Sequence, residues 1–144
     1  CALADVRGEE DFTLVRNNPG YSGLLPRHYD REEQTRIIRV TLSRLDDFIE
    51  EIPTVRYIKI DCEGAELRVL RGANLLLKRD RPTVSFECGD ASLESYDYDA
   101  GDIFDFWSML GYSVQSITRQ SMDRAQFVDA SARQEYWDYI AFPS

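Results

Sequence analysis

The sequence predicts an α/β domain with a mostly parallel β-sheet that helices cover on both faces. Short runs rich in β-branched and aromatic residues alternate with stretches whose apolar residues recur at helical spacing. Such alternation is typical of parallel sheets, because two parallel neighbours need a crossover, usually a helix, between them. The chain has 144 residues, the length of one domain, so we interpret residues 1–144 as a single domain.

The first quarter of the chain predicts a hairpin and a long loop. The short apolar runs at residues 1–6 and 12–15 are separated by the turn-rich residues 7–11, which favours an antiparallel hairpin. Residues 16–35 show neither helical nor strand periodicity, and a connection of this length is usually functional or mobile. We therefore interpret residues 16–35 as a candidate lid.

The rest of the chain predicts alternating strands and helices. A strand at residues 36–41 is followed by apolar residues at helical spacing, which predict a helix that ends before Pro53. The strand at residues 55–61 precedes a longer helical pattern, in which Gly72 is a possible kink. Asp102 is a candidate N-cap for a later helix. The further strands that the pattern predicts are residues 83–87, 112–117 and 136–142.

The composition excludes several classes of function. Acidic residues outnumber basic ones by 26 to 17, which gives a formal net charge of −9 and argues against binding to nucleic acid or to an anionic membrane surface. No stretch approaches the roughly 20 apolar residues of a membrane span. Residues 1–10 lack the basic segment and long apolar run of a secretory signal. We therefore expect a cytoplasmic protein.

The three cysteines indicate neither a disulfide framework nor a zinc site. Their number is odd, and no two of them have the CxxC spacing. Free cysteines are usually buried, so we expect Cys62 and Cys88 to be small core residues.

Carboxylates stand at the ends of two of the expected strands. Asp61 ends the strand at residues 55–61 and Glu87 ends the strand at residues 83–87, where ligands bind in open α/β sheets. Asp61 is a candidate to accept the proton of an attacking hydroxyl, or to coordinate a hard divalent cation with Glu63 or Glu87. The alternative is structural: Asp61 or Glu63 caps the next helix, and Glu63 with Glu66 imitates a capping box.

Three further polar residues have both a functional and a structural interpretation. His28, the only histidine, lies in the candidate lid and is either a general base or a surface residue. Glu66 is either a site residue or a partner of the helix dipole in the first turn. For Lys59 we expect an ion pair with a neighbouring carboxylate.

Several spaced motifs resemble the FkbM family of S-adenosylmethionine-dependent methyltransferases. The first is Ile58-Lys59-Ile60-Asp61-Cys62-Glu63-Gly64-Ala65-Glu66, and residues 69–73 and 81–87 continue it. Residues 41–48 are similar to the family's "tLDd" segment, with two residues inserted between Leu42 and Leu45. Residues 2–5 and 21–24 look like the family's third strand and serine-containing loop, and residues 138–143 look like a late strand. The resemblance thus covers nearly the whole chain.

The resemblance implies a Rossmann-like class I methyltransferase sheet whose last strand is antiparallel. It implies S-adenosylmethionine as the cofactor and O-methylation of a sugar, polyketide or other small-metabolite hydroxyl as the reaction. Together with the strand-end carboxylates it predicts these site residues: Asp61, Glu63 and His28 as catalytic, Asp5, Ser22 and Asp61 as cofactor-binding, and Glu87 and Glu66 as substrate-binding. No resident metal is assigned.

An acidic segment follows the second of these strand ends. Residues 90–102 carry five acidic side chains, with Tyr96 and Tyr98 between them. Such a run is usually a solvated loop, and it is also a candidate contact for a cationic or sugar acceptor.

The sequence departs from the family at the cofactor-binding turn. None of the eight glycines forms a GxGxxG motif after a strand, and the second strand with its ribose-binding carboxylate is also missing. We therefore expect a sheet that lacks the first two strands and leaves an edge of the strand at residues 55–61 unpaired, where a homodimer can form. The alternative function is a non-catalytic α/β remnant that acts as a binding or dimerisation module. A flavodoxin-like receiver or nucleotide domain is disfavoured, because no phosphate-cradling loop is visible.

Overall fold

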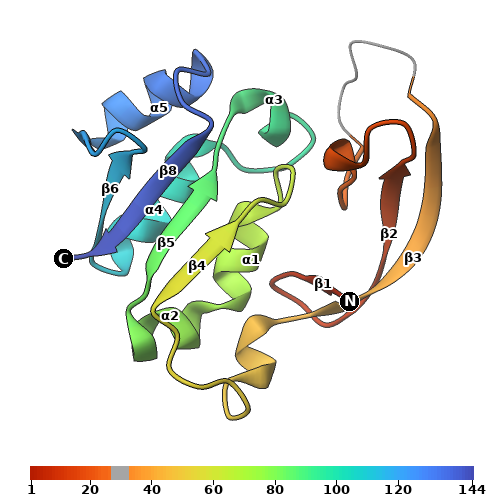
Figure 1. The fold of residues 1–144 in the computed structure, drawn as a ribbon, viewed down its shortest axis with the longest axis horizontal. Helices are drawn as coiled ribbons and strands as arrows, with labels where there is room; N and C mark the ends of the chain where they lie inside the picture. Colours follow the sequence, from red (N-terminus) through yellow and green to blue (C-terminus); the bar gives the residue numbers. More distant parts are fainter. Residues whose placement is uncertain (27–32) are drawn as a thin grey trace.

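The computed structural model describes residues 1–26 and 33–144, which form two β-sheets and a layer of helices (Figure 1). The smaller sheet has the order β1-β3-β2, with β1 at Ala2–Leu3, β2 at Gly8–Val15 and β3 at Thr35–Ser43. The larger sheet has the order β4-β5-β8-β6-β7. Its strands are β4 (Tyr57–Ile60), β5 (Thr83–Glu87), β6 (Tyr112–Ser116), β7 (Ser121–Met122) and β8 (Asp138–Pro143).

The sequence predicts a mostly parallel, Rossmann-like sheet, and this prediction is wrong. Strand β4 pairs parallel with β5, and β1 pairs parallel with β3, but the other four pairings among the described strands are antiparallel. The cause in the larger sheet is the C-terminal strand β8, which lies between β5 and β6 and runs antiparallel to both. The class is therefore α/β with two small mixed sheets.

The smaller sheet also differs from the expected hairpin. Residues 8–15 form one continuous strand, β2, which pairs antiparallel with β3 along its whole length, from Gly8 opposite Leu42 to Val15 opposite Thr35. The backbone turns between β1 and β2 at Gly8, whose φ of +148° suits a residue without a side chain. The hairpin partner of residues 12–15 is therefore β3 rather than residues 1–6.

The helices are α1 (Glu66–Gly72), α2 (Asn74–Asp80), α3 (Asp90–Leu93), α4 (Ala100–Met109) and α5 (Arg124–Ala132), with 3₁₀ turns η1 (Pro19–Tyr21) and η2 (Leu45–Phe48). The helix expected before Pro53 is only the turn η2, because β3 continues to Ser43. The kink expected at Gly72 is confirmed, since α1 ends there and α2 begins two residues later. Helix α4 is capped by Asp99 rather than Asp102; the two form a reciprocal capping box. No helix in the described residues is long and apolar enough to cross a membrane.

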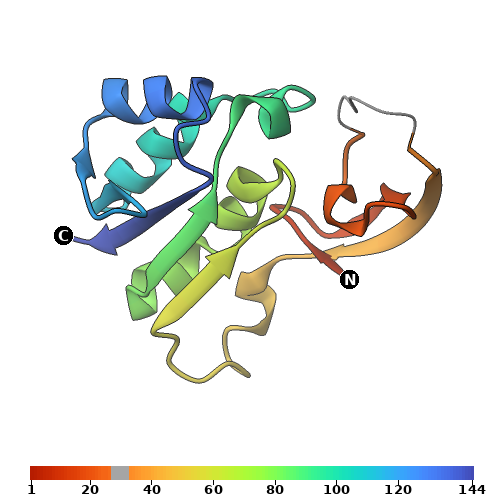
Figure 2. The ribbon, with the colours of Figure 1, turned by 45° about the horizontal axis from the view of Figure 1, so that its top comes forward.

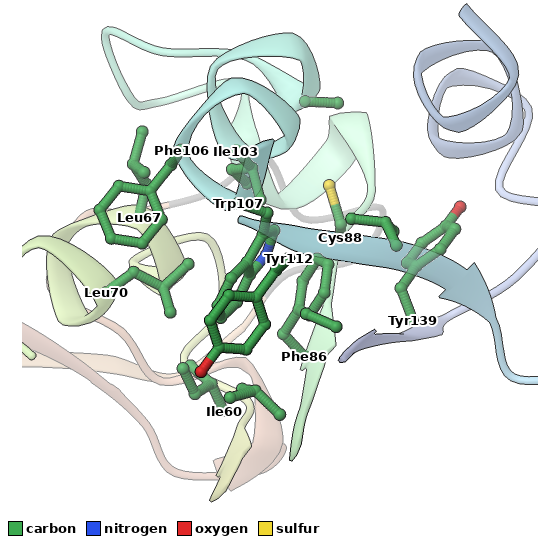
Figure 3. Packing of buried hydrophobic residues seen from close by; sticks show 14 of the residues in the cluster. Ile60, Leu67, Leu70, Phe86, Cys88, Ile103, Phe106, Trp107, Tyr112 and Tyr139 are labelled. Atoms are coloured by element: carbon green, nitrogen blue, oxygen red, sulfur yellow. The ribbon is translucent and has the colours of Figure 1, made fainter. Parts of the chain in front are cut away.

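The main core lies between the larger sheet and its helices. Figure 3 shows Phe86 of β5, Tyr139 of β8 and Trp107 of α4 packed together, and all three side chains are fully buried. Phe127 of α5 joins them, with ring centroids 4.7 Å from Tyr139 and 6.1 Å from Phe86. The helices therefore gather on one face of this sheet, as Figure 2 also shows.

The opposite face of the larger sheet is not covered by helices, which corrects the expectation of helices on both faces. Tyr57 of β4 is 58% exposed there, and the side chain of Lys59 is 51% exposed. Strand β4 is an edge strand of this sheet, because its one partner among the described residues is β5. The unpaired edge expected for this strand is therefore present.

A second, smaller core joins the two sheets. Ala4 and Leu42 of the smaller-sheet region pack there against Leu24 and against Ala65 at the start of α1. Gly72, at the end of α1, lies against the chain after β1: a Cβ atom on it would be 2.0 Å from the carbonyl oxygen of Ala4. This contact fixes α1, and with it the loop that precedes α1, against the smaller sheet.

Candidate functional site

The loop between β4 and α1, residues 61–65, has a backbone shape that depends on glycine. Glu63 and Gly64 both have positive φ, +52° and +99°. A Cβ atom on Gly64 would lie 2.1 Å from the carbonyl oxygen of Ser92 in α3, so no other residue fits without a shift of the backbone. In the ribbon views this loop accordingly lies beside α3 (Figures 1 and 2).

The buried carboxylate of Glu66 holds the same loop from within. Its Oε1 accepts hydrogen bonds from the backbone N–H of Cys62 at 2.8 Å and of Gly64 at 3.4 Å. Glu66 is only 1% exposed, and this burial raises its pKa above the usual carboxyl value. The capping alternative for Asp61 and Glu63 is wrong, because the N-cap of α1 is Ala65 and no side chain caps it. The substrate contact expected for Glu66 stays a prediction.

Three carboxylates meet where β4 and β5 end. One oxygen each of Asp61, Glu63 and Glu87 lies within 4.8 Å of the others. Parallel pairing of β4 with β5 brings the two strand ends together, and the left-handed turn at Glu63 adds the third carboxylate. The structure thus brings the two strand-end carboxylates together, and the catalytic role expected for Asp61 and the substrate contact expected for Glu87 stay predictions.

The crowding of these carboxylates changes their protonation. Burial, a hydrogen bond with Asp61 and the negative charge of Glu63 together raise the pKa of Glu87 to about 8. Lys59 binds Asp61 from the other side, with Nζ–Oδ2 at 3.2 Å, and also binds Asp138 at 3.2 Å, which confirms the ion pair expected for Lys59. Near neutral pH, the carboxyl group of Glu87, the one that Asp61 contacts in this pair, therefore favours its protonated form. Such a pair can take up or hold a proton, and its oxygens are also suitable ligands for a hard divalent cation.

A cavity of about 270 Å³ lies beside Asp61, between the two sheets. Leu3, Phe12 and Leu24 supply apolar wall, and Ser22 and Asp61 supply polar groups. Ser22 Oγ accepts a hydrogen bond from the N–H of Val15 at 3.0 Å, which leaves the hydroxyl proton available for a ligand. The structure thus brings together two of the three residues expected to bind the cofactor.

The third of these residues, Asp5, does not line the cavity. It accepts a hydrogen bond from Arg68 Nε at 3.2 Å, in an ion-pair group that includes Glu10. The cofactor contact expected for Asp5 therefore stays a prediction. His28 lies outside the described residues, so its expected role as a base also stays a prediction.

The cavity fits the adenosine part of S-adenosylmethionine. Ligand sites are mostly apolar with a few well-placed polar groups, and typical volumes begin at about 300 Å³. The apolar side chains of Leu3, Phe12 and Leu24 suit a flat ring, and Ser22 and Asp61 suit hydroxyl groups. A cavity of about 270 Å³ lies just below this range and suits the nucleoside better than the whole cofactor.

Tyr98 supports the site through a contact that the sequence does not predict. The hydroxyl of Tyr98 donates a hydrogen bond to the carbonyl oxygen of Gly64, 34 positions away in the chain. Tyr98 is 7% exposed, although it lies in a run of acidic residues that suggests a solvated loop. The one signal in the sequence was a large aromatic residue within that polar segment.

Comparison with known proteins identifies the family. The family model described as the methyltransferase FkbM domain matches residues 3–114, a range that includes β2 to β5, α1 to α4 and all three clustered carboxylates. Residues 138–143 also resemble a late strand of the family, but they lie outside the matched range. The searches of curated proteins and of solved structures gave no match. The matched range covers well over half of the sequence and confirms the resemblance seen in its motifs, so the chain belongs to the FkbM methyltransferase domain family.

Proposed function

We propose that this chain takes part in S-adenosylmethionine-dependent methylation of a hydroxyl group on a small metabolite such as a sugar or a polyketide. The observation that carries the proposal is the group of three carboxylates at the ends of β4 and β5, one of which, Asp61, also lines the cavity between the sheets. Membership of the FkbM family supports methyl transfer as the reaction class.

The cofactor, when bound, supplies an electrophilic methyl group attached to a positively charged sulfur. Ser22, Asp61 and the apolar wall would hold its adenosine part. Positioning of this kind can contribute about 7–11 kcal/mol to lowering a barrier, because the reacting groups no longer have to find each other.

The contribution of this chain to the chemistry is the removal of a proton. As the hydroxyl oxygen of the acceptor forms its new bond to the methyl carbon, the bond from that carbon to sulfur would break with its electron pair left on sulfur, the O–H electron pair stays on the oxygen and the proton passes to Asp61. Lys59 forms an ion pair with this carboxylate, with Nζ 3.2 Å from Asp61 Oδ2, and so helps to position it. Glu87 shares the proton afterwards, because its raised pKa favours the protonated carboxyl.

The experiment that tests the function measures S-adenosylhomocysteine released from S-adenosylmethionine in the presence of a panel of sugars and hydroxyl-bearing polyketides. We expect release to depend on the acceptor and to rise about tenfold per pH unit up to pH 8 and then level off, because Glu87 can share the transferred proton only after it has lost its own, which its pKa of about 8 delays. The Glu87→Gln variant carries no titrating group at this position, so its slower rate should be flat between pH 6 and 9. A folded protein that releases no product with any acceptor would contradict the proposal.

A second candidate function is a dimerisation module without catalysis. One observation favours it: β4 has one free edge among the described strands. Free edges present unpaired N–H and C=O groups that can pair with another chain. Light scattering separates the two functions, because a module of this kind must dimerise whereas the catalytic proposal does not require it.

A further inference from the structure

Strand β3 has a long edge that no other strand covers in the described part of the chain. On one side, β2 pairs with residues 35–42, whereas on the other side β1 reaches only Leu42 and Ser43. Figures 1 and 2 accordingly show β3 along the outside of the molecule. A free edge of this kind can pair with a strand of another chain. The exposed residues of this stretch are Thr35, Arg36, Ile37, Arg39 and Thr41.

The hydrogen bonds on both sides of β3 show which of its backbone groups point outward. Next to the pairing with β2, the N–H of Arg16 donates to the carbonyl oxygen of Gln34 at 2.9 Å, so Gln34 faces β2. On the opposite side, the N–H of Ala4 donates to the carbonyl oxygen of Ser43 at 2.9 Å, so Ser43 faces away from β2. Residues of an antiparallel strand alternate between these two directions. The outward backbone groups of the free edge are therefore those of Thr35, Ile37, Arg39 and Thr41.

The outer edge of β2 is partly covered. Thr13 and Gly23 exchange two backbone hydrogen bonds, at 2.9 and 3.1 Å, and the hydroxyl of Ser22 accepts the N–H of Val15. The loop at residues 22–23 thus blocks the C-terminal half of this edge. The free edge of β4 belongs to a strand of only four residues. The free edge of β3 is therefore longer than that of β4.

A second copy of the same strand fits this edge. When two β3 strands pair antiparallel about a twofold axis at Ile38, Ile37 lies opposite Arg39 of the second copy, and Thr35 lies opposite Thr41. All four of these residues point their N–H and C=O groups across the edge, so each opposite pair exchanges two hydrogen bonds. Like charges directly opposite each other would destabilise the pairing, and in this register no arginine lies opposite an arginine.

The side chains on the inner face of the two strands also match. Ile38 lies opposite the second copy's Ile38, and Phe12 flanks each of them from β2, so the middle row is apolar. In the next row, Arg36 lies opposite Val40 of the second copy, whose neighbour on β2 is Glu10. Two strand spacings, about 10 Å, separate Arg36 from that Glu10, and the two long side chains can bridge this distance over Val40.

Arg36 is available for this contact. It has no ion-pair partner among the described residues, and its side chain is exposed. Glu10 binds Arg68 at 2.8 Å but is still 30% exposed, so a second cation can approach it. Arg39 already binds Asp11 at 3.0 Å, which offsets its charge beside the second strand. The edge is therefore complementary to itself in hydrogen bonding, apolar contact and charge.

We propose that the free edge of β3 is an interface between two copies of this chain, paired antiparallel about Ile38 so that the two smaller sheets join into one. The same residues serve both copies, as in the twofold dimers that are the commonest protein oligomers. The interface does not rest on the proposed function, and it uses a different strand from the β4 edge of the dimerisation module.

Disulfide cross-linking tests the register of the two strands. Because residue 38 faces β2, the two residues at this position form a non-hydrogen-bonded pair with Cα atoms about 4.5 Å apart, which a disulfide can bridge. The two residues at position 37 are diagonal neighbours about 7–8 Å apart, which a disulfide cannot bridge. With diamide as the oxidant, we expect Ile38→Cys to form a covalent dimer at least tenfold faster than Ile37→Cys, although Ile37 is the more exposed residue. Both variants also carry Cys1→Ser, because Cys1 is exposed.

A charge reversal tests the contact between Arg36 and Glu10. Sedimentation equilibrium should give twice the mass of the 144-residue chain at high concentration. We expect Arg36→Glu to weaken the dimer at least tenfold, because it places an acidic side chain next to Glu10 of the second copy. The matched control is Arg119→Glu, the same change at an exposed arginine between β6 and β7, for which we expect less than a twofold effect. Circular dichroism shows that each variant is folded.

Three results would overturn the proposal. The first is a chain that stays monomeric up to about 1 mM. The second is an equal rate of cross-linking in Ile38→Cys and Ile37→Cys, and the third is an unchanged dimer in Arg36→Glu, because either would place the contact elsewhere, as at the edge of β4. None of these measurements requires a cofactor or an acceptor, so the proposed function stands or fails separately.

Discussion

Replacing Asp61 with Asn should lower the rate of methyl transfer by about a hundredfold to ten-thousandfold, the usual contribution of a positioned general base. Asp61 is the residue that both lines the cavity between the sheets and belongs to the carboxylate group. An amide of the same shape keeps the packing but cannot accept the proton of the hydroxyl. The measurement is S-adenosylhomocysteine release at saturating acceptor, with circular dichroism to show that the fold is kept.

Asp138→Asn is the matched control for Asp61→Asn. Both aspartates bind Lys59 at 3.2 Å, so both variants lose one ion pair with the same lysine, but Asp138 does not line that cavity. Because ion pairs at exposed positions contribute about 0–1 kcal/mol, both variants should unfold within about 1 kcal/mol of the parent. Full methyl transfer by Asp61→Asn, or equal loss in both variants, would remove Asp61 from the catalytic role.

Replacing Gly72 with Ala should lower the free energy of unfolding by about 3 kcal/mol. The new Cβ atom would meet the carbonyl oxygen of Ala4 at 2.0 Å and its carbonyl carbon at 2.9 Å. Both are backbone atoms, which cannot rotate away as the end of a side chain does. The free energy of unfolding in urea measures this loss.

Gly20→Ala is the matched control for Gly72→Ala. A Cβ atom on Gly20 would have a single neighbour within 4 Å, the side-chain oxygen of Asn18 at 4.0 Å, and Gly20 does not have a positive φ. The change in stability at this surface position should stay within about 0.5 kcal/mol. Similar effects of the two substitutions would mean that α1 does not pack tightly against the chain after β1.

The sequence predicted the local elements of the larger sheet well. The runs at residues 55–61 and 83–87 became β4 and β5, and their terminal carboxylates met as parallel neighbours should. Periodicity and β-branched composition are local properties, so a single sequence can report them.

Long-range placement was beyond this kind of prediction. The pattern of residues 138–143 indicates a strand but not that the strand lies between β5 and β6, which makes two of its pairings antiparallel. Strand β2 pairs with β3, which begins 20 positions after β2 ends, so the partner of residues 12–15 was not the nearest apolar run. The hydrogen bond from Tyr98 to Gly64 likewise joins segments whose sequences carry no sign of each other. Such contacts depend on the whole chain topology, and loop closure between distant segments leaves no local signature.

The measurement that tests the account most directly is a calorimetric titration of the purified 144-residue chain with S-adenosylhomocysteine. The product ligand probes the cavity between the sheets without requiring the acceptor. Because the cavity suits the nucleoside part of the ligand, we expect saturable one-to-one binding with Kd between about 10 μM and 1 mM, or about −7 to −4 kcal/mol. Ser22→Ala should weaken this binding, whereas Asp138→Asn should leave it unchanged. The absence of saturable heat up to about 5 mM ligand would contradict a cofactor site in this chain.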